Sequence, residues 1–246
     1  MRAVRDDTIL ISLMLVNNET GAITDVAGIF SELRRRNPRP LLHTDAVQAF
    51  LKLPLLPAAS VADLMSLSAH KIHAPKGVGA LFIRKGVKLP PLIVGGEQES
   101  SRRAGTESLP LICAFGEAAR LGADSAADSA RHMYGLRDRT VSVLKRDIPG
   151  LIVIGGGAPH ILSISLPGFK SEVIMNFLES KSVYVSKSSA CKKGGRSHVL
   201  EAMGLPGKVT DGALRISFSR FTSPDEVDIL CQSLKEACAG LFTSLS

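Results

Sequence analysis

Polar side chains that could carry out chemistry follow three short apolar runs in the first third of the sequence. In chain order they are Asn18, then Asp45 with Gln48, then Ser68, His70 and Lys71. In an open parallel sheet, ligands bind beyond the carboxyl ends of the strands, so successive strands would present these groups at one edge. The sequence therefore predicts a ligand site at that edge.

The residue types at this edge fit one cofactor, pyridoxal phosphate. Lys71 follows an apolar run directly, and poor solvation would lower the pKa of its amine toward the neutral form that makes an imine with an aldehyde. An aspartate can keep a pyridine nitrogen protonated, while hydroxyl and imidazole groups can bind phosphate. Each group also has an ordinary explanation, as a turn residue, a helix cap, a strand end or a solvated lysine. Their coincidence at one edge favours the cofactor.

The elements that must position these groups follow from the apolar pattern. The continuous run Thr8–Val16 is typical of a buried parallel strand. Thr24 and Asp25 can cap a helix that Asn37-Pro38 ends, and Leu41–Thr44 then predicts a second strand. Strand, helix and strand predict a right-handed crossover, with Leu64–Ser68 as the third strand.

The rest of the chain predicts a long helical region followed by a second, smaller α/β domain. The helical pattern begins after Leu109 and breaks at Pro149-Gly150. We place the domain boundary within it, giving domains 1–128 and 129–246. We expect three strands after it, at Ile161–Leu166, Ser182–Val185 and Ala213–Phe218. We also expect two helices: one with Val173, Ile174, Phe177 and Leu178 facing inward, and a terminal one that begins with a capping box at Ser223–Glu226.

Composition limits the classes of protein that fit. The 246 residues carry a net charge of +7, but basic residues are scattered among acidic ones and aromatic residues make up only 4%, so nucleic-acid binding is not favoured. No apolar run approaches the roughly 18 residues of a membrane span. The start of the chain lacks the apolar region of a signal peptide, which favours the cytoplasm.

The four cysteines suggest neither a disulfide framework nor a metal site. Cys113, Cys231 and Cys238 lie among apolar residues at helical spacing, where a thiol acts as a small hydrophobe. Cys191 lies in a polar loop whose cations favour thiolate over thiol. That setting suits a nucleophile, although a lone loop cysteine is more often a tolerated residue.

Several motifs occur in an order and spacing that resemble one family. They are His43-Thr-Asp-Ala-Val-Gln48, Ser68-Ala-His-Lys71 with Pro75-Lys-Gly77, Gly95-Gly-Glu-Gln98 through Arg102-Arg-Ala-Gly-Thr106, and Ser189-Ala-Cys191. Over nearly the whole chain the sequence resembles the cysteine desulfurases, which are class V, fold type I pyridoxal-phosphate enzymes. The resemblance implies part of a fold type I large domain, with a mostly parallel sheet, plus a smaller C-terminal α/β domain.

The resemblance also implies roles for individual residues. Lys71 would hold the cofactor through an imine, Asp45 would pair with the pyridine nitrogen, Asn18 and Gln48 would bond the region of the ring oxygen, Ser68 and His70 would bind the phosphate, Thr106 would reach the phosphate in the other subunit of a homodimer, Arg215 would hold the substrate carboxylate, and Cys191 would accept sulfur. Arg215 is preferred over Arg220 because the family's Arg-x-Ser pattern falls there.

The implied activity is the conversion of L-cysteine to L-alanine, with a persulfide left on Cys191. The sulfur would pass to an acceptor protein for iron–sulfur cluster assembly or thiolation. The sequence departs from the family because roughly the first third of a member's chain has no counterpart, including a phosphate-binding threonine and a histidine that stacks on the ring. The alternatives are a catalytically silent fragment that acts as a binding module, and another class V enzyme such as a selenocysteine lyase.

Overall fold

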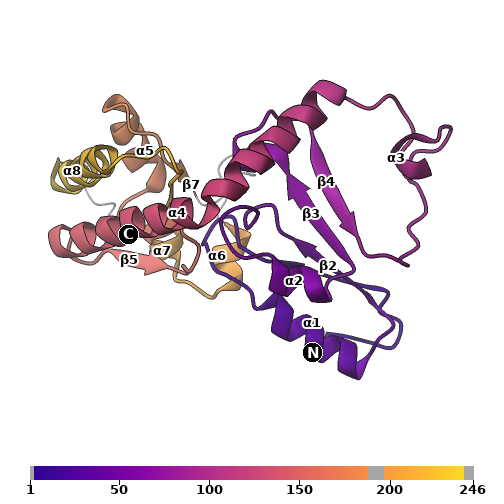
Figure 1. Ribbon diagram of the computed structural model, residues 1–246. Coiled ribbons are helices and arrows are strands. Elements are labelled where there is room, and N and C mark those ends of the chain that lie inside the picture. Colours follow the sequence, from indigo (N-terminus) through magenta and orange to yellow (C-terminus); the bar gives the residue numbers. More distant parts are fainter. Residues whose placement is uncertain (1–2, 188–196, 241–246) are drawn as a thin grey trace. The chain divides into compact units, whose positions relative to one another are not determined.

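The structure is a computed structural model that describes residues 3–187 and 197–240 (Figure 1). The chain divides into two compact units, residues 1–16 with 24–126 and residues 17–23 with 127–246. The short segment 17–23 therefore belongs with the second half of the chain, which the sequence does not lead one to expect. The sequence predicts that residues 1–128 and 129–246 form two domains, and this division stays a prediction.

The first unit contains a four-stranded mixed sheet with the strand order β1-β2-β3-β4. Its strands are β1 (Leu10–Met14), β2 (Leu41–Asp45), β3 (Leu64–Ser68) and β4 (Gly79–Ile83). The first three strands are parallel and β4 is antiparallel to β3. This arrangement confirms the mostly parallel sheet that the sequence predicts.

Strand β1 is more exposed than the sequence predicts. Ile9 is 82% exposed and Leu10 is 49% exposed, and only Leu15 and Val16, just beyond the strand, are buried. Among the described residues β1 is hydrogen-bonded to β2 alone, so it lies at a sheet edge. An edge strand has a neighbour on one side only, which explains the incomplete burial of its apolar side chains.

The two faces of β2 differ, and this difference positions a predicted site residue. Leu42 and Thr44 are buried, whereas His43 and Asp45 alternate with them on the opposite face. Helix α1 (Val26–Arg36) precedes β2, and the carboxylate of its cap Asp25 accepts the N–H of Gly28 at 2.9 Å, as predicted. The other helices that begin in this unit are α2 (Leu56–Val61), α3 (Gln98–Ser101) and α4 (Leu109–Asp147).

Helix α4 confirms the long helical region. It is continuous from Leu109 to Asp147. Its residues up to 126 belong to the first unit, and the remainder belong to the second. In the first unit, Phe115 of α4 meets Phe50 edge to face, with ring centroids 6.3 Å apart.

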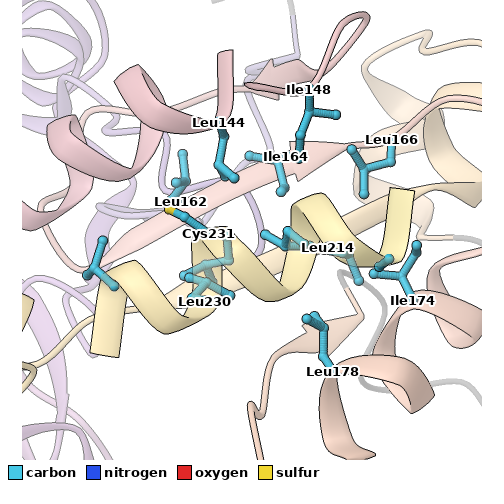
Figure 2. Close-up of a cluster of buried hydrophobic side chains, with 14 of the residues drawn as sticks. Leu144, Ile148, Leu162, Ile164, Leu166, Ile174, Leu178, Leu214, Leu230 and Cys231 are labelled. Atoms are coloured by element: carbon cyan, nitrogen blue, oxygen red, sulfur yellow. The ribbon is translucent and has the colours of Figure 1, made fainter. Parts of the chain in front are cut away.

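The second unit contains an antiparallel sheet with the strand order β5-β6-β8-β7. Its strands are β5 (Ile152–Ile154), β6 (Ile161–Ser165), β7 (Ser186–Lys187) and β8 (Ala213–Ser217). Its shorter helices are α5 (Ser171–Ser180), α6 (His198–Ala202), α7 (Gly207–Asp211) and α8 (Pro224–Gly240). Figure 2 shows its core, in which Leu230 and Cys231 of α8 lie over Leu162, Ile164 and Leu214 of the sheet.

Two predictions for this unit are wrong in part. In α5, Ile174 and Leu178 are fully buried as predicted, but Val173 is 46% exposed because it lies off the face that packs on the core. No strand covers Ser182–Val185: Ser182 has a left-handed φ of 60°, and the N–H of Val183 bonds to Leu178 O at 2.9 Å. These residues close the helix, and the strand forms later, at β7.

The segment 17–23 is attached to the second sheet through close backbone contacts. Gly21 has a left-handed φ of 69°, and a Cβ there would lie 2.8 Å from the carbonyl oxygen of Ile161. Ala22 forms an antiparallel bridge with Gly157, and the N–H of Ala158 bonds to Gly21 O at 2.9 Å. Glycine is needed at position 21 both for its conformation and for this approach.

Across residues 3–187 and 197–240, no helix combines the length and apolarity needed to cross a bilayer. Cys113, Cys231 and Cys238 are all free thiols. Cys231 is buried, but Cys113 is exposed, so the prediction that Cys113 acts as a small hydrophobe is wrong.

Candidate active site

Three of the predicted site residues lie on one short turn after β3. Ser68 ends the strand, and a 3-10 helix, Ala69–Ile72, carries His70 and Lys71. Oγ of Ser68 and Nδ1 of His70 are 2.8 Å apart, so these two groups are hydrogen-bonded. The turn brings a hydroxyl, an imidazole and an amine together within four residues.

Asp45 lies at the carboxyl end of the neighbouring parallel strand. It stands opposite Ser66 of β3, two residues before Ser68. One carboxylate oxygen, Oδ1, accepts the N–H of Val47 at 2.9 Å, which holds the side chain at the strand end. Asp45 and the Ser68–Lys71 turn therefore lie at the same edge of the sheet, as predicted. Gln48 follows in the turns that leave β2.

Lys52 also belongs to this edge, and the sequence analysis missed it. Its Nζ donates a hydrogen bond to the main-chain oxygen of Lys71 at 2.7 Å. Burial lowers the pKa of Lys52 to about 8, and the positive charge of Lys71 acts in the same direction. The available signal was a lysine within the apolar stretch Ala49–Leu53, since lysine is seldom buried without a role.

Arg215 and Asn18 meet in the second unit. Nη1 of Arg215, on β8, donates to the main-chain oxygen of Asn18 at 2.8 Å, and Nη2 donates to Ser186 Oγ at 3.3 Å. Its Nε is buried and has no hydrogen-bond partner among the described residues. Burial lowers the pKa of the guanidinium, while the nearby Glu19 carboxylate acts to raise it. A fork with an unused donor suits a carboxylate ligand.

Glu19 is a second residue that the sequence analysis missed. It is buried, and its Oε2 accepts a hydrogen bond from Ser197 Oγ at 2.5 Å. Ser197 also caps α6, accepting the N–H of Leu200 at 3.2 Å. The turn that bears Asn18 is thus joined to the first described residue after the gap at 188–196. An acidic residue three positions after the end of an apolar run was the signal in the sequence.

Thr106 lies apart from the Ser68–Lys71 turn in the sequence, on an exposed loop. The loop lines a cavity of about 900 Å³ within the first unit, together with β4 and the start of α4. Arg102 and Arg103 line the same cavity, and so do Glu99 and Glu107, so its wall carries charges of both signs.

The predicted residues therefore fall into two groups. Asp45, Gln48, Ser68, His70, Lys71 and Thr106 belong to the first unit, and Asn18 and Arg215 belong to the second. Cys191 lies outside the described residues. Among the residues that are described, no cluster of three or more histidine, cysteine, aspartate or glutamate side chains could hold a metal ion.

Comparison with known proteins identifies the family of this chain. Residues 1–230 match the model of the protein family described as "Aminotransferase class-V". The chain is 43% identical over 235 residues to "Cysteine desulfurase 2" of Trichormus variabilis, covering 94% of this chain and 58% of that protein. It is 43% identical over 227 residues to "Cysteine desulfurase" of Bradyrhizobium diazoefficiens, covering 90% of this chain and 57% of the other.

A solved structure titled "NIFS-LIKE PROTEIN" superposes with a TM-score of 0.89 at 36% identity, covering 98% of this chain and 64% of that one. The chain belongs to the aminotransferase class-V family. It spans about 58% of the length of the curated relatives that it matches.

Proposed function

We propose that this chain is a pyridoxal-phosphate-dependent cysteine desulfurase, which converts L-cysteine to L-alanine and holds the sulfur as a persulfide. The observation that carries the proposal is the turn after β3, where Lys71 follows a hydrogen-bonded Ser68–His70 pair at the strand end. The similarity to proteins named cysteine desulfurase supports the choice of substrate.

The donor set of the first unit fits pyridoxal phosphate. The cofactor would supply an aldehyde and a ring that withdraws electrons from the substrate's α-carbon. Lys71 offers the amine for the aldehyde, Asp45 a carboxylate for the pyridine nitrogen, and Ser68 and His70 two donors for phosphate. Asp45 bonds only one N–H through Oδ1 in the described contacts, which leaves Oδ2 for the ring.

The chain's own residues would orient the substrate and move its protons. Arg215 would bind the substrate carboxylate, because its fork is fixed by Asn18 and Ser186 and its buried Nε has no partner among the described residues. Asn18 would help to orient substrate and cofactor, and Gln48 would bond the ring oxygen region. The Lys71 amine, once free, would carry the proton of the substrate's α-carbon.

Cys191 would accept the sulfur. The bond between carbon and sulfur in L-cysteine breaks, a sulfur–sulfur bond forms at Cys191, and the carbon takes a proton to give alanine. The thiol of Cys191 loses one proton in this exchange, so the atoms and charges balance. This role rests on the motif Ser189-Ala-Cys191 and its surrounding cations.

The proposal includes a homodimer, a sulfur-acceptor protein and a cytoplasmic location. Leu92 is 97% exposed and Val94 is 74% exposed on the loop between β4 and Thr106, and such apolar side chains favour a protein partner. Free thiols at all three described cysteines fit a reducing compartment. The sulfur would serve iron–sulfur cluster assembly or thiolation.

The test follows both products of the reaction. The chain is incubated with pyridoxal phosphate and L-cysteine without added reductant; alanine is measured, and the peptide bearing Cys191 is examined by mass spectrometry. We expect one alanine for each persulfide in a single turnover, and neither product from Cys191→Ser. Alanine formation that Cys191→Ser leaves unchanged would contradict the role of Cys191, and its absence from the parent chain would contradict the enzyme.

A further inference from the structure

Lys52 is a partly buried cation that the proposed reaction does not use. It lies 19 residues before Lys71 in the sequence, yet its Nζ donates to the Lys71 main-chain oxygen at 2.7 Å. A buried ammonium loses hydration, so a specific partner is needed to offset that loss. Its partner is the residue proposed to hold the cofactor.

The backbone holds Lys52 in place through a series of turns. Ala49 O accepts the N–H of Lys52 and that of Leu53, both at 2.9 Å. The preceding residue, Leu51, has a left-handed φ of 59°, which is uncommon for leucine. Its side chain packs so closely on Gly122 of α4 that a Cβ on that glycine would overlap it. The position of Lys52 is therefore determined by the main-chain bonds to Ala49 and by the packing of Leu51 on α4.

The carbonyl that Lys52 binds lies in a short element. The 3-10 helix Ala69–Ile72 has only four residues, and the last carbonyls of a helix lack helical donors. Lys52 supplies a donor to one of them. Because the turns that carry Lys52 start at Asp45, this bond joins the segment after β2 to the turn after β3.

We propose that Lys52 is a positioning residue for Lys71, fixing its main chain and placing a second positive charge near its amine. The inference rests on the proposed function only in taking Lys71 as the reactive amine. The positive charge of Lys71 lowers the pKa of Lys52, so the two ammonium groups lie near enough to repel each other. Lys71 is the charged group that acts on Lys52 in this structure.

The first measurement needs no cofactor. Lys71 is acetylated competitively with limiting acetic anhydride between pH 6 and 11, and its labelling is followed by peptide mass analysis. Lys52→Met removes charge and donor, Lys52→Gln keeps an N–H donor without charge, and Lys52→Arg keeps both. Lys85→Met, at an exposed lysine of the same unit, is the control.

We expect the labelling midpoint of Lys71 to be lower in Lys52→Arg than in the parent chain, because arginine keeps its charge above pH 8, where Lys52 has lost its own. The midpoint should stay unchanged in Lys52→Met, Lys52→Gln and Lys85→Met. A midpoint that is the same in all variants would overturn the inference. Thermal unfolding verifies that each variant is folded, and if Lys52→Arg is not, the second measurement decides the question.

The second measurement separates positioning from charge. Each variant is mixed with limiting pyridoxal phosphate and reduced with borohydride, and the modified peptide is quantified. We expect several-fold less Lys71 adduct in Lys52→Met, and recovery in Lys52→Gln and Lys52→Arg. Equal adduct in every variant, or an adduct on Lys52 itself in the parent chain, would overturn the positioning role. If the parent chain gave no adduct, the proposed function would fail, while the labelling midpoints would still judge Lys52.

Discussion

At the scale of single residues, the environment of each side chain decides its chemistry. Lys71 lies in a turn whose main chain is hydrogen-bonded at Ala69, next to a hydroxyl–imidazole pair and a second lysine. Arg215 keeps a buried Nε without a partner among the described residues, although its other nitrogens are bonded. An unused donor on a fixed cation is a binding feature, because leaving it unpaired costs free energy that a ligand can recover.

The buried position of Lys52 makes the stability of the fold depend on pH. Its pKa is about 8 in the folded chain, whereas the ordinary value of 10.5 applies to an unfolded chain, so between these limits the unfolded state binds more protons. Stability therefore rises with pH through this window. We expect the free energy of unfolding of the parent chain to rise by about 1–3 kcal/mol relative to Lys52→Met between pH 8 and 10.5. Urea unfolding of both proteins measures this difference; parallel pH curves would show that Lys52 is not perturbed.

At the scale of elements, local signals in the sequence predicted much of the fold. Asp25 caps α1 as expected, and the capping box before α8 forms, with Ser223 N–H bonded to Glu226 at 2.6 Å and Glu226 N–H bonded to Ser223 Oγ at 3.2 Å. Strand β3 has the predicted bounds. These features depend on residues close in sequence, so a single sequence contains them.

Features that depend on distant residues were not predicted. The exposure of Val173 depends on which face of α5 meets the sheet, and the absence of a strand at Ser182–Val185 depends on how that helix closes. The bonds from Lys52 to Lys71 and from Ser197 to Glu19 join segments 19 and 178 residues apart. The spacing of apolar residues indicates which face of one helix or strand is buried, but it does not indicate which distant residue a side chain will bond to.

The attachment of segment 17–23 gives an element-scale prediction. We expect Gly21→Ala to destabilise the fold by about 3 kcal/mol, because alanine is strained at this φ and its Cβ would press on Ile161 O. Gly204→Ala is the matched control: its φ is 71°, but no atom lies within 4 Å of the added carbon. The control should lose only about 1 kcal/mol in urea unfolding. Equal losses would mean that the contact with Ile161 contributes nothing.

At the scale of the whole molecule, the family and the fold were predictable from motifs spread along the chain. The matched relatives cover nine-tenths or more of this chain, and the first unit has the mostly parallel sheet that the sequence predicts. The division of the site residues between two units was not predictable, since segment 17–23 follows the first strand in sequence yet belongs with the second unit.

The exposed loop between β4 and Thr106 gives a prediction for assembly. We expect the chain to form dimers through this loop, so a double change of Leu92 and Val94 to serine should weaken the dimer at least tenfold. Ile9→Ser, at an apolar residue that is 82% exposed elsewhere on the first unit, should leave the dimer constant unchanged. Sedimentation equilibrium measures both; a monomeric parent chain, or dimers that survive the double change, would contradict this interface.

Lys71 is the residue that we propose binds pyridoxal phosphate in this chain. The most direct measurement is to mix the chain with the cofactor, reduce with borohydride and map the modified peptide by mass spectrometry, with Lys71→Ala as the control. We expect one stoichiometric adduct, on Lys71, and none at that level in the control. A chain that yields no adduct, or one whose adduct is unaffected by Lys71→Ala, would contradict it.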